Sequence, residues 1–163
     1  MPEQRTIERA KEDAEEGKSP STQAGEFVRE EMDHIREGKH GARSAKQAIA
    51  IGLSKARRAG VKLPPVKGDS EMARQTARDY KRGQTAPSRK PSLTRSRATH
   101  AALEREGSEA ASHTALSRQA HRAARTRGSA DLKRAAQKAV RTKGPEGRRQ
   151  AALKAVRTRQ RGK

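Results

Sequence analysis

Hydrophobic positions recur every three or four residues over most of the chain, which predicts helices rather than strands. Over residues 3–16 the hydrophobic stripe is thin, because Ile7 is its only large member, and Gly17 is expected to end this helix. Residues 22–37 have a stronger hydrophobic face. The large members of that face are Phe27, Val28, Met32 and Ile35.

Residues 44–59 are predicted to form the strongest helix of the chain. Ser44 and Gln47 have the spacing of a capping box, in which the serine oxygen accepts from a first-turn amide and the glutamine reaches back to the backbone. Gly60 suits a left-handed cap at the C-terminal end. The proline pair at 64–65 prevents the helix from continuing.

The predicted helices at 22–37 and 44–59 are expected to pair as a hairpin through a turn between Gly38 and Gly41. The second helix offers an apolar face of Ala45, Ala48, Ile49, Leu53 and Ala56, with Ile51 beside it. Residues 21–64 contain nine bulky apolar side chains, which can build only a small core of marginal stability. This hairpin is therefore a candidate docking or homodimerisation unit.

A further helix is predicted over residues 69–82, with Asp69 as its N-cap and Gly83 as its end. Residues 84–99 are rich in Ser, Thr, Pro and Arg, which is typical of a flexible basic linker. A short helix is expected near residues 101–106.

A 16-residue repeat fills the C-terminal part of the chain. Arg-Thr-Arg-Gly at 125–128 recurs as Arg-Thr-Lys-Gly at 141–144 and as Arg-Thr-Arg at 157–159. Each copy predicts a helix with basic residues on one side and small apolar residues on the other, separated from the next copy by the glycine. Because alanine buries little surface, we expect these helices to form mainly when a polyanion neutralises their charge.

The predicted fold is mostly α: a small helical hairpin with an extensive disordered or conditionally helical basic tail. The expected parts are an acidic N-terminal helix, the hairpin, a basic helix, a flexible basic linker and the basic helical repeats. They cover residues 1–20, 21–64, 65–83, 84–112 and 113–163, respectively.

The charge distribution supports this division. The chain has 39 basic and 19 acidic residues, a formal charge of +20. Residues 1–37 carry −5, residues 38–83 carry +9 and residues 84–163 carry +16. Only 17 residues are Leu, Ile, Val or Phe, a composition typical of intrinsically disordered proteins. Such a chain is not expected to enclose a dry active site, so we predict no enzymatic activity and no small-molecule substrate.

The basic tail predicts a polyanionic partner. We expect sequence-independent binding to the DNA backbone, in a nucleoid-associated or DNA-maintenance role, with DNA favoured over RNA. Two other functions stay open: an RNA- or ribosome-associated protein, and a hydrophilic stress-protective disordered protein. The candidate phosphate-binding residues are Lys46, Lys55, Arg57, Arg58, Arg118, Arg122, Arg125, Arg134, Lys138, Arg141, Arg149, Lys154, Arg157 and Arg161.

The sequence contains few signs of metal-binding or cofactor chemistry. The chain has no cysteine, and no two of its histidines have the i, i+4 spacing of a helical metal site. Nor do we expect a cluster of acidic residues beside a pair of histidines. We therefore expect the histidines to be solvated or to face phosphate, and we expect no metal site and no cofactor. The histidines are His34, His40, His100, His113 and His121. With no long apolar stretch and no signal-peptide pattern, the expected location is the cytoplasm, at the nucleoid, without membrane contact.

Two segments carry a resemblance to a known family. They are STQAGEFVREE at 21–31 and GKHGARSAKQAIAIGLSKARRAG at 38–60. Together they resemble small basic bacterial proteins of unknown function, some of which are labelled plasmid stabilisation proteins. The resemblance covers roughly residues 1–83, implies a bacterial source and a DNA-associated role, and supplies no catalytic residues. The tail resembles bacterial linker-histone-like Ala/Lys/Arg-rich repeats in composition.

Overall fold

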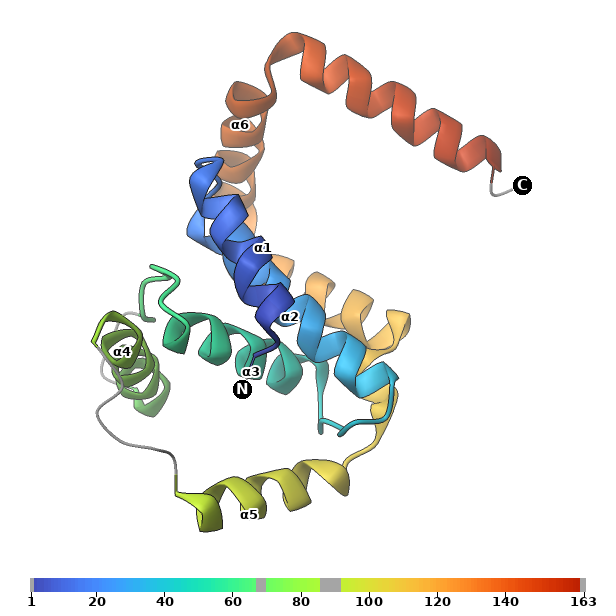
Figure 1. Ribbon diagram of the computed structural model, residues 1–163. Coiled ribbons are helices and arrows are strands. Elements are labelled where there is room, and N and C mark those ends of the chain that lie inside the picture. Colours follow the sequence, from blue (N-terminus) through green and yellow to red (C-terminus); the bar gives the residue numbers. More distant parts are fainter. Residues whose placement is uncertain (1, 67–69, 86–91, 162–163) are drawn as a thin grey trace. The chain divides into compact units, whose positions relative to one another are not determined.

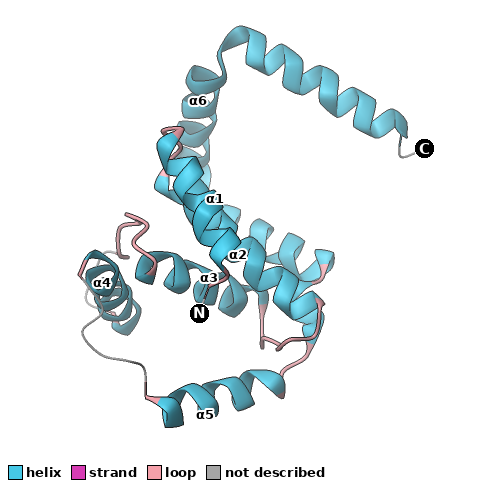
Figure 2. Ribbon diagram, in the orientation of Figure 1, coloured by secondary structure: helices cyan, strands magenta, loops and turns pink. Residues whose placement is uncertain are grey.

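The computed structural model describes residues 2–66, 70–85 and 92–161, and its regular structure within these ranges is entirely helical (Figures 1 and 2). The predicted mostly α class is therefore confirmed. The elements are α1 (Gln4–Glu15), α2 (Pro20–Arg36), α3 (Ala45–Arg58), α4 (Glu71–Gln84), α5 (Leu93–Glu104), the 3-10 helix η1 (Ser108–Ala111) and α6 (His113–Arg161). The chain divides into two compact units, Met1–Gln119 and Ala120–Lys163.

The helix ends in the first unit follow short-range signals. Gly17, just beyond α1, has φ +72°, a conformation that glycine adopts without strain. The Ser44 Oγ accepts from the Gln47 N–H at 3.2 Å. The Gln47 side chain in turn accepts from the Arg43 N–H at 2.9 Å, so the predicted capping box is present with the glutamine reaching one residue further back. Gly60 has φ +97°, as expected for the residue after this helix.

Helices α2 and α3 form the expected hairpin, and α3 packs with its predicted face, in which Ala45, Ala48 and Ala56 are buried, although that face also includes Gly52, which was not predicted. Ala48, Gly52 and Ala56, spaced four residues apart, are buried. A Cβ at Gly52 would lie 2.7 Å from the Val28 Cα, so the two backbones are closer than any side chain at this position would allow. The larger side chains of α3 are only partly buried: Ile49, Ile51 and Leu53. The contact between the helices is therefore made chiefly by small residues.

Residues that were predicted to form a flexible linker belong to the packed part of the first unit. Ala110 and Ala111 of η1 are buried in a cluster with Met32 and Ile35 of α2. The Gly41 N–H donates to the Leu103 carbonyl at 2.9 Å. Within the predicted linker at 84–112, the structure thus has α5, longer than the expected short helix, and η1. Alanines give little hydrophobic signal in a sequence, although they fill a close-packed site well.

Helix α4 differs from its predicted bounds at both ends. Its N-cap is Ser70, whose Oγ accepts from the Ala73 N–H at 3.2 Å, while Asp69 lies outside the described residues. At the other end, Gly83 continues the helix instead of ending it. A side chain at Gly83 would collide with the Arg57 carbonyl, so the glycine permits close packing of α4 on α3.

The second unit consists of the greater part of α6. The glycines at its predicted breaks, Gly128 and Gly144, have φ of +73° and +64° and non-helical ψ, so α6 comprises three helical segments. Pro145 then takes the first position of the last segment, where its missing N–H costs nothing. The expected disorder of the tail is not confirmed. Among the described residues, no helix combines the length and apolar character needed to cross a membrane.

Candidate functional site

The second unit concentrates exposed positive charge. Residues 120–163 contain 15 basic and two acidic side chains, which is +13 of the net +20. Every basic side chain that the structure describes in this range is exposed. Within that described range, one ion pair forms, between Arg134 and Asp131. The charge of this unit is therefore presented to solvent rather than used in packing.

The repeat in the sequence is also a repeat in local structure. In each copy the threonine hydroxyl donates to the backbone carbonyl four residues earlier, which satisfies the hydroxyl within the helix. The pairs are Thr126 with Arg122 at 3.0 Å, Thr142 with Lys138 at 2.9 Å and Thr158 with Lys154 at 3.0 Å. The three copies thus hold their basic residues on equivalent turns of helix.

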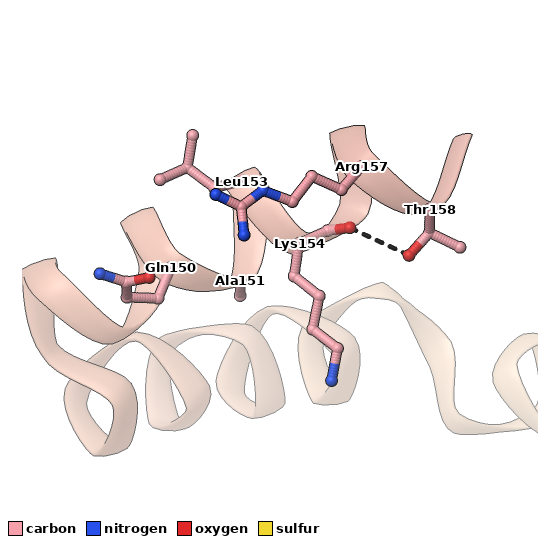
Figure 3. Close-up of a pocket in the computed structure, with 6 residues that line it drawn as sticks. All are labelled: Gln150, Ala151, Leu153, Lys154, Arg157 and Thr158. Atoms are coloured by element: carbon pink, nitrogen blue, oxygen red, sulfur yellow. Dashed lines mark hydrogen bonds between the residues drawn. The ribbon is translucent and has the colours of Figure 1, made fainter. Parts of the chain in front are cut away.

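Figure 3 shows the last copy of the repeat, with the Thr158 hydroxyl bonded to the Lys154 carbonyl. A shallow hollow here is lined by Gln150, Ala151, Leu153, Lys154, Arg157 and Thr158. All six belong to one helical segment, so the hollow has a single wall and cannot enclose a small molecule.

Lys55, predicted to bind phosphate, instead contacts two buried carboxylates of α2. Its Nζ lies 2.6 Å from the Glu31 Oε2 and 3.5 Å from the Glu30 Oε1. Glu31 is 1% exposed and Glu30 is 6% exposed. Two carboxylates at such depth require a nearby cation, because burial of an uncompensated charge is costly. The position of Lys55 is therefore explained by the fold.

Arg57 and Arg58 are likewise engaged within the fold, at the contact between α3 and α4. The Arg58 Nε lies 3.7 Å from the buried carboxylate of Asp79, and its Nη2 donates to the Ser54 Oγ at 3.0 Å. Arg57 is itself buried, and this burial lowers the pKa of its guanidinium. Of the four candidates on α3, Lys46 is the one with an exposed side chain not engaged in this way.

Four residues for which no functional role was predicted come together on one side of the first unit. The His40 Nε2 lies 3.2 Å from the Glu31 Oε1, and the His34 Nε2 lies 2.8 Å from the Glu3 Oε1. The two imidazole rings meet edge to face, with centroids 6.0 Å apart. The hydrogen bond from His34 is the main cause that lowers the pKa of Glu3, and Lys39 adds to it.

The prediction of solvated histidines without a neighbouring acidic cluster is therefore wrong for His34 and His40. Their side chains are only 14% and 10% exposed. A partial signal was present, since Glu31 and His34 are three residues apart and share a helix face. The position of His40 could not be read in this way, because it depends on the turn after α2. His100, His113 and His121 are exposed.

Residues 17–67 match the sequence model of a family of unknown function, DUF6496. The matched range contains α2 and α3, but neither α1 nor the basic repeats. No curated protein and no solved structure matches the chain. The family match supports neither the plasmid stabilisation label nor the likeness of the tail to linker histones.

Proposed function

We propose that the protein binds the phosphate backbone of duplex DNA, without reading its sequence, through the basic helices of residues 120–161. The observation that supports this proposal most is the exposed and largely unpaired charge of that unit. Phosphate contacts by Lys and Arg release condensed counterions from DNA, which supplies most of the free energy of non-specific binding. A nucleoid-associated or DNA-maintenance role would follow from this activity.

The contacts are assigned to cations that recur in the repeat. Arginines are the larger class among them, and a guanidinium can hold a phosphate through two parallel hydrogen bonds. The proposed contact residues are Arg122, Arg125, Arg134, Lys138, Arg141, Arg149, Lys154, Arg157 and Arg161, with Lys46 and Arg118 of the first unit as candidates for additional contacts. The side chain of Arg161 lies outside the described part of the structure.

Composition favours a duplex over a single strand. The two aromatic residues of the chain, Phe27 and Tyr80, both lie outside the second unit. Proteins that bind single strands, and those that read RNA loops, stack bases on aromatic side chains. The second unit contains no Phe, Tyr or Trp, which favours contacts with the phosphate backbone over base stacking.

The test is a binding titration of the full chain with fluorescent duplex DNA, duplex RNA and single-stranded DNA over a salt series. We expect duplexes of different sequence to bind equally, and the logarithm of the affinity to fall by about 0.9 per phosphate contact for each tenfold rise in salt. Tighter binding to duplex RNA than to duplex DNA would favour the RNA-associated alternative. Absence of binding to all three at physiological salt would overturn the proposal and leave the stress-protective one.

A further inference from the structure

The histidine–carboxylate cluster, defined as Glu3, Glu31, His34 and His40, has the composition and spacing of a metal site. Ligating atoms of Glu31, His34 and His40 all lie within 4.8 Å of one another. Glu3 adds a carboxylate oxygen at 2.8 Å from the His34 Nε2. Two imidazoles with two carboxylates form a donor set that suits Zn²⁺ in tetrahedral geometry.

We infer that this cluster binds one Zn²⁺ ion, held by Glu31, His34, His40 and Glu3. Two of the donor pairs already have about the separation that such an ion requires. Zinc bonds of about 2.0–2.1 Å separate neighbouring donors of a tetrahedral site by about 3.3 Å. The structure has 3.2 Å between the His40 Nε2 and the Glu31 Oε1, and 2.8 Å between the His34 Nε2 and the Glu3 Oε1. Glu3 lies outside the group of ligating atoms that are within 4.8 Å of one another, so its exposed side chain would move to join the ion.

The surroundings of His40 provide an independent reason. Its Nδ1 lies 3.1 Å from the Gly41 carbonyl oxygen, while its Nε2 faces the Glu31 carboxylate. A neutral imidazole carries one N–H and can donate to only one of these two acceptors. With Zn²⁺ between the Nε2 and the carboxylate, the Nδ1–H donates to Gly41. Metal-bound histidines are commonly oriented by a backbone carbonyl in this way.

The charge around the cluster also favours a cation. Four carboxylates lie here, those of Glu3, Glu30, Glu31 and Glu37, against the ammonium groups of Lys39 and Lys55. With neutral histidines these groups carry two negative charges in excess, and the carboxylates of Glu30 and Glu31 are deeply buried. Lys55 lies beside the Oε2 of Glu31, whereas the Oε1 faces His40, so the lysine and the ion would use different oxygens of one carboxylate.

The ion would have a structural role. Four protein ligands close the coordination sphere, unlike a catalytic zinc site, which keeps one position open. The ligands come from the segment before α1, from α2 and from the turn that leads to α3. Zinc would therefore stabilise the first unit by joining three segments that have only a small apolar core between them.

The test is calorimetric titration of the metal-free full chain with ZnCl₂. We expect one ion per chain with a Kd below about 1 µM. Replacement of both ligands by His34→Asn with His40→Gln should weaken binding by at least about 100-fold. The matched control is His113→Gln with His121→Gln, which removes two exposed histidines of α6 and should leave the Kd unchanged.

A second variant guards against loss of folding. Glu3 has a side chain 53% exposed and lies before α1, so Glu3→Gln should keep the helical far-ultraviolet spectrum while weakening zinc binding by about 10-fold. Zinc should also raise the melting temperature of the wild-type chain and raise that of the His34/His40 variant less. The inference is overturned if the wild-type chain does not bind zinc, or if the Glu3 and His34/His40 variants bind it as tightly as the wild-type chain.

Discussion

The two units of the chain use positive charge in opposite ways. Residues 1–119 contain 24 basic and 17 acidic residues, and two of their cations, Lys55 and Arg58, lie against buried carboxylates. Residues 120–163 contain 15 basic and two acidic residues, and none of their described side chains is buried. A count of basic residues therefore does not locate a nucleic-acid surface, because only cations without an internal partner can neutralise phosphate.

The two units also differ in what holds their helices in place. In the first unit, buried alanines, Phe27 and Ile35 join helices that are distant in sequence. In the second unit, the larger apolar residues of the repeat are between 42% and 49% exposed: Leu132, Val140, Leu153 and Val156. Short alanine-rich helices without packing are marginal in water. If the second unit binds a polyanion, as we propose, its helices would therefore gain more stability from it than those of the first unit.

The largest effect on stability is expected from removal of the cation beside the two buried carboxylates. In the metal-free chain, Lys55→Met should lower the free energy of unfolding by about 3–5 kcal/mol, because Glu30 and Glu31 would stay buried without the ammonium group that lies beside both of them. The matched control is Arg157→Met in the exposed repeat, which should change it by less than about 0.5 kcal/mol. Urea unfolding followed by circular dichroism measures both. Equal effects of the two variants would contradict the conclusion that cations stabilise the fold of the first unit but not that of the second.

A smaller effect is expected where the backbones of α2 and α3 approach each other. Gly52→Ala should cost about 1–3 kcal/mol, because the added Cβ would lie 2.7 Å from the Val28 Cα and force the helices apart. Gly25→Ala in α2 is the control, since its Cβ would meet nothing within 4 Å. That variant should stabilise the chain by about 0.5–1 kcal/mol through helix propensity. Thermal melts of the two variants should thus shift in opposite directions, and a shared direction would refute the close packing.

The smallest effect concerns a single cap. Ser44→Ala should destabilise the first unit by about 1 kcal/mol, because it removes the acceptor of the Gln47 N–H at the start of α3. Ser92→Ala, at the N-cap of α5, removes a side chain that makes no capping hydrogen bond and should change stability by a few tenths of a kcal/mol at most. Urea midpoints compare the two, and a larger loss from Ser92→Ala would contradict the assignment of the cap.

The features that could be predicted from the sequence are those that short-range signals determine. The hairpin, the cap at Ser44 and the breaks at Gly128 and Gly144 all follow from residues within a few positions of one another. The packing of Ala110 and Ala111 on α2 could not be predicted, because it joins segments about 75 residues apart through side chains with little hydrophobic signal. Gly83 was misread for a similar reason, since its use is a tertiary contact with Arg57.

The candidate site residues divide in the same way, into those whose surroundings can be predicted from the sequence and those whose surroundings depend on the fold. The sequence alone shows that the cations of the repeat occupy equivalent positions, and those cations whose side chains are described are exposed in the structure. The carboxylates that Lys55 and Arg58 meet could not be identified from the sequence, because Glu31 and Asp79 lie on other helices. The cluster around His40 was missed because only the fold brings it to Glu31.

The central claim is tested most directly by the salt dependence of duplex DNA binding for two variants with the same loss of charge. One variant replaces four cations of the repeat by glutamine: Lys138, Arg141, Lys154 and Arg157. The other replaces four exposed cations of the first unit: Lys11, Arg29, Lys62 and Arg74. The log–log slope should fall by about 3.6 for the first variant and by less than about 0.9 for the second. Equal falls would show that net charge alone governs binding, and would contradict the assignment of the interface to the second unit.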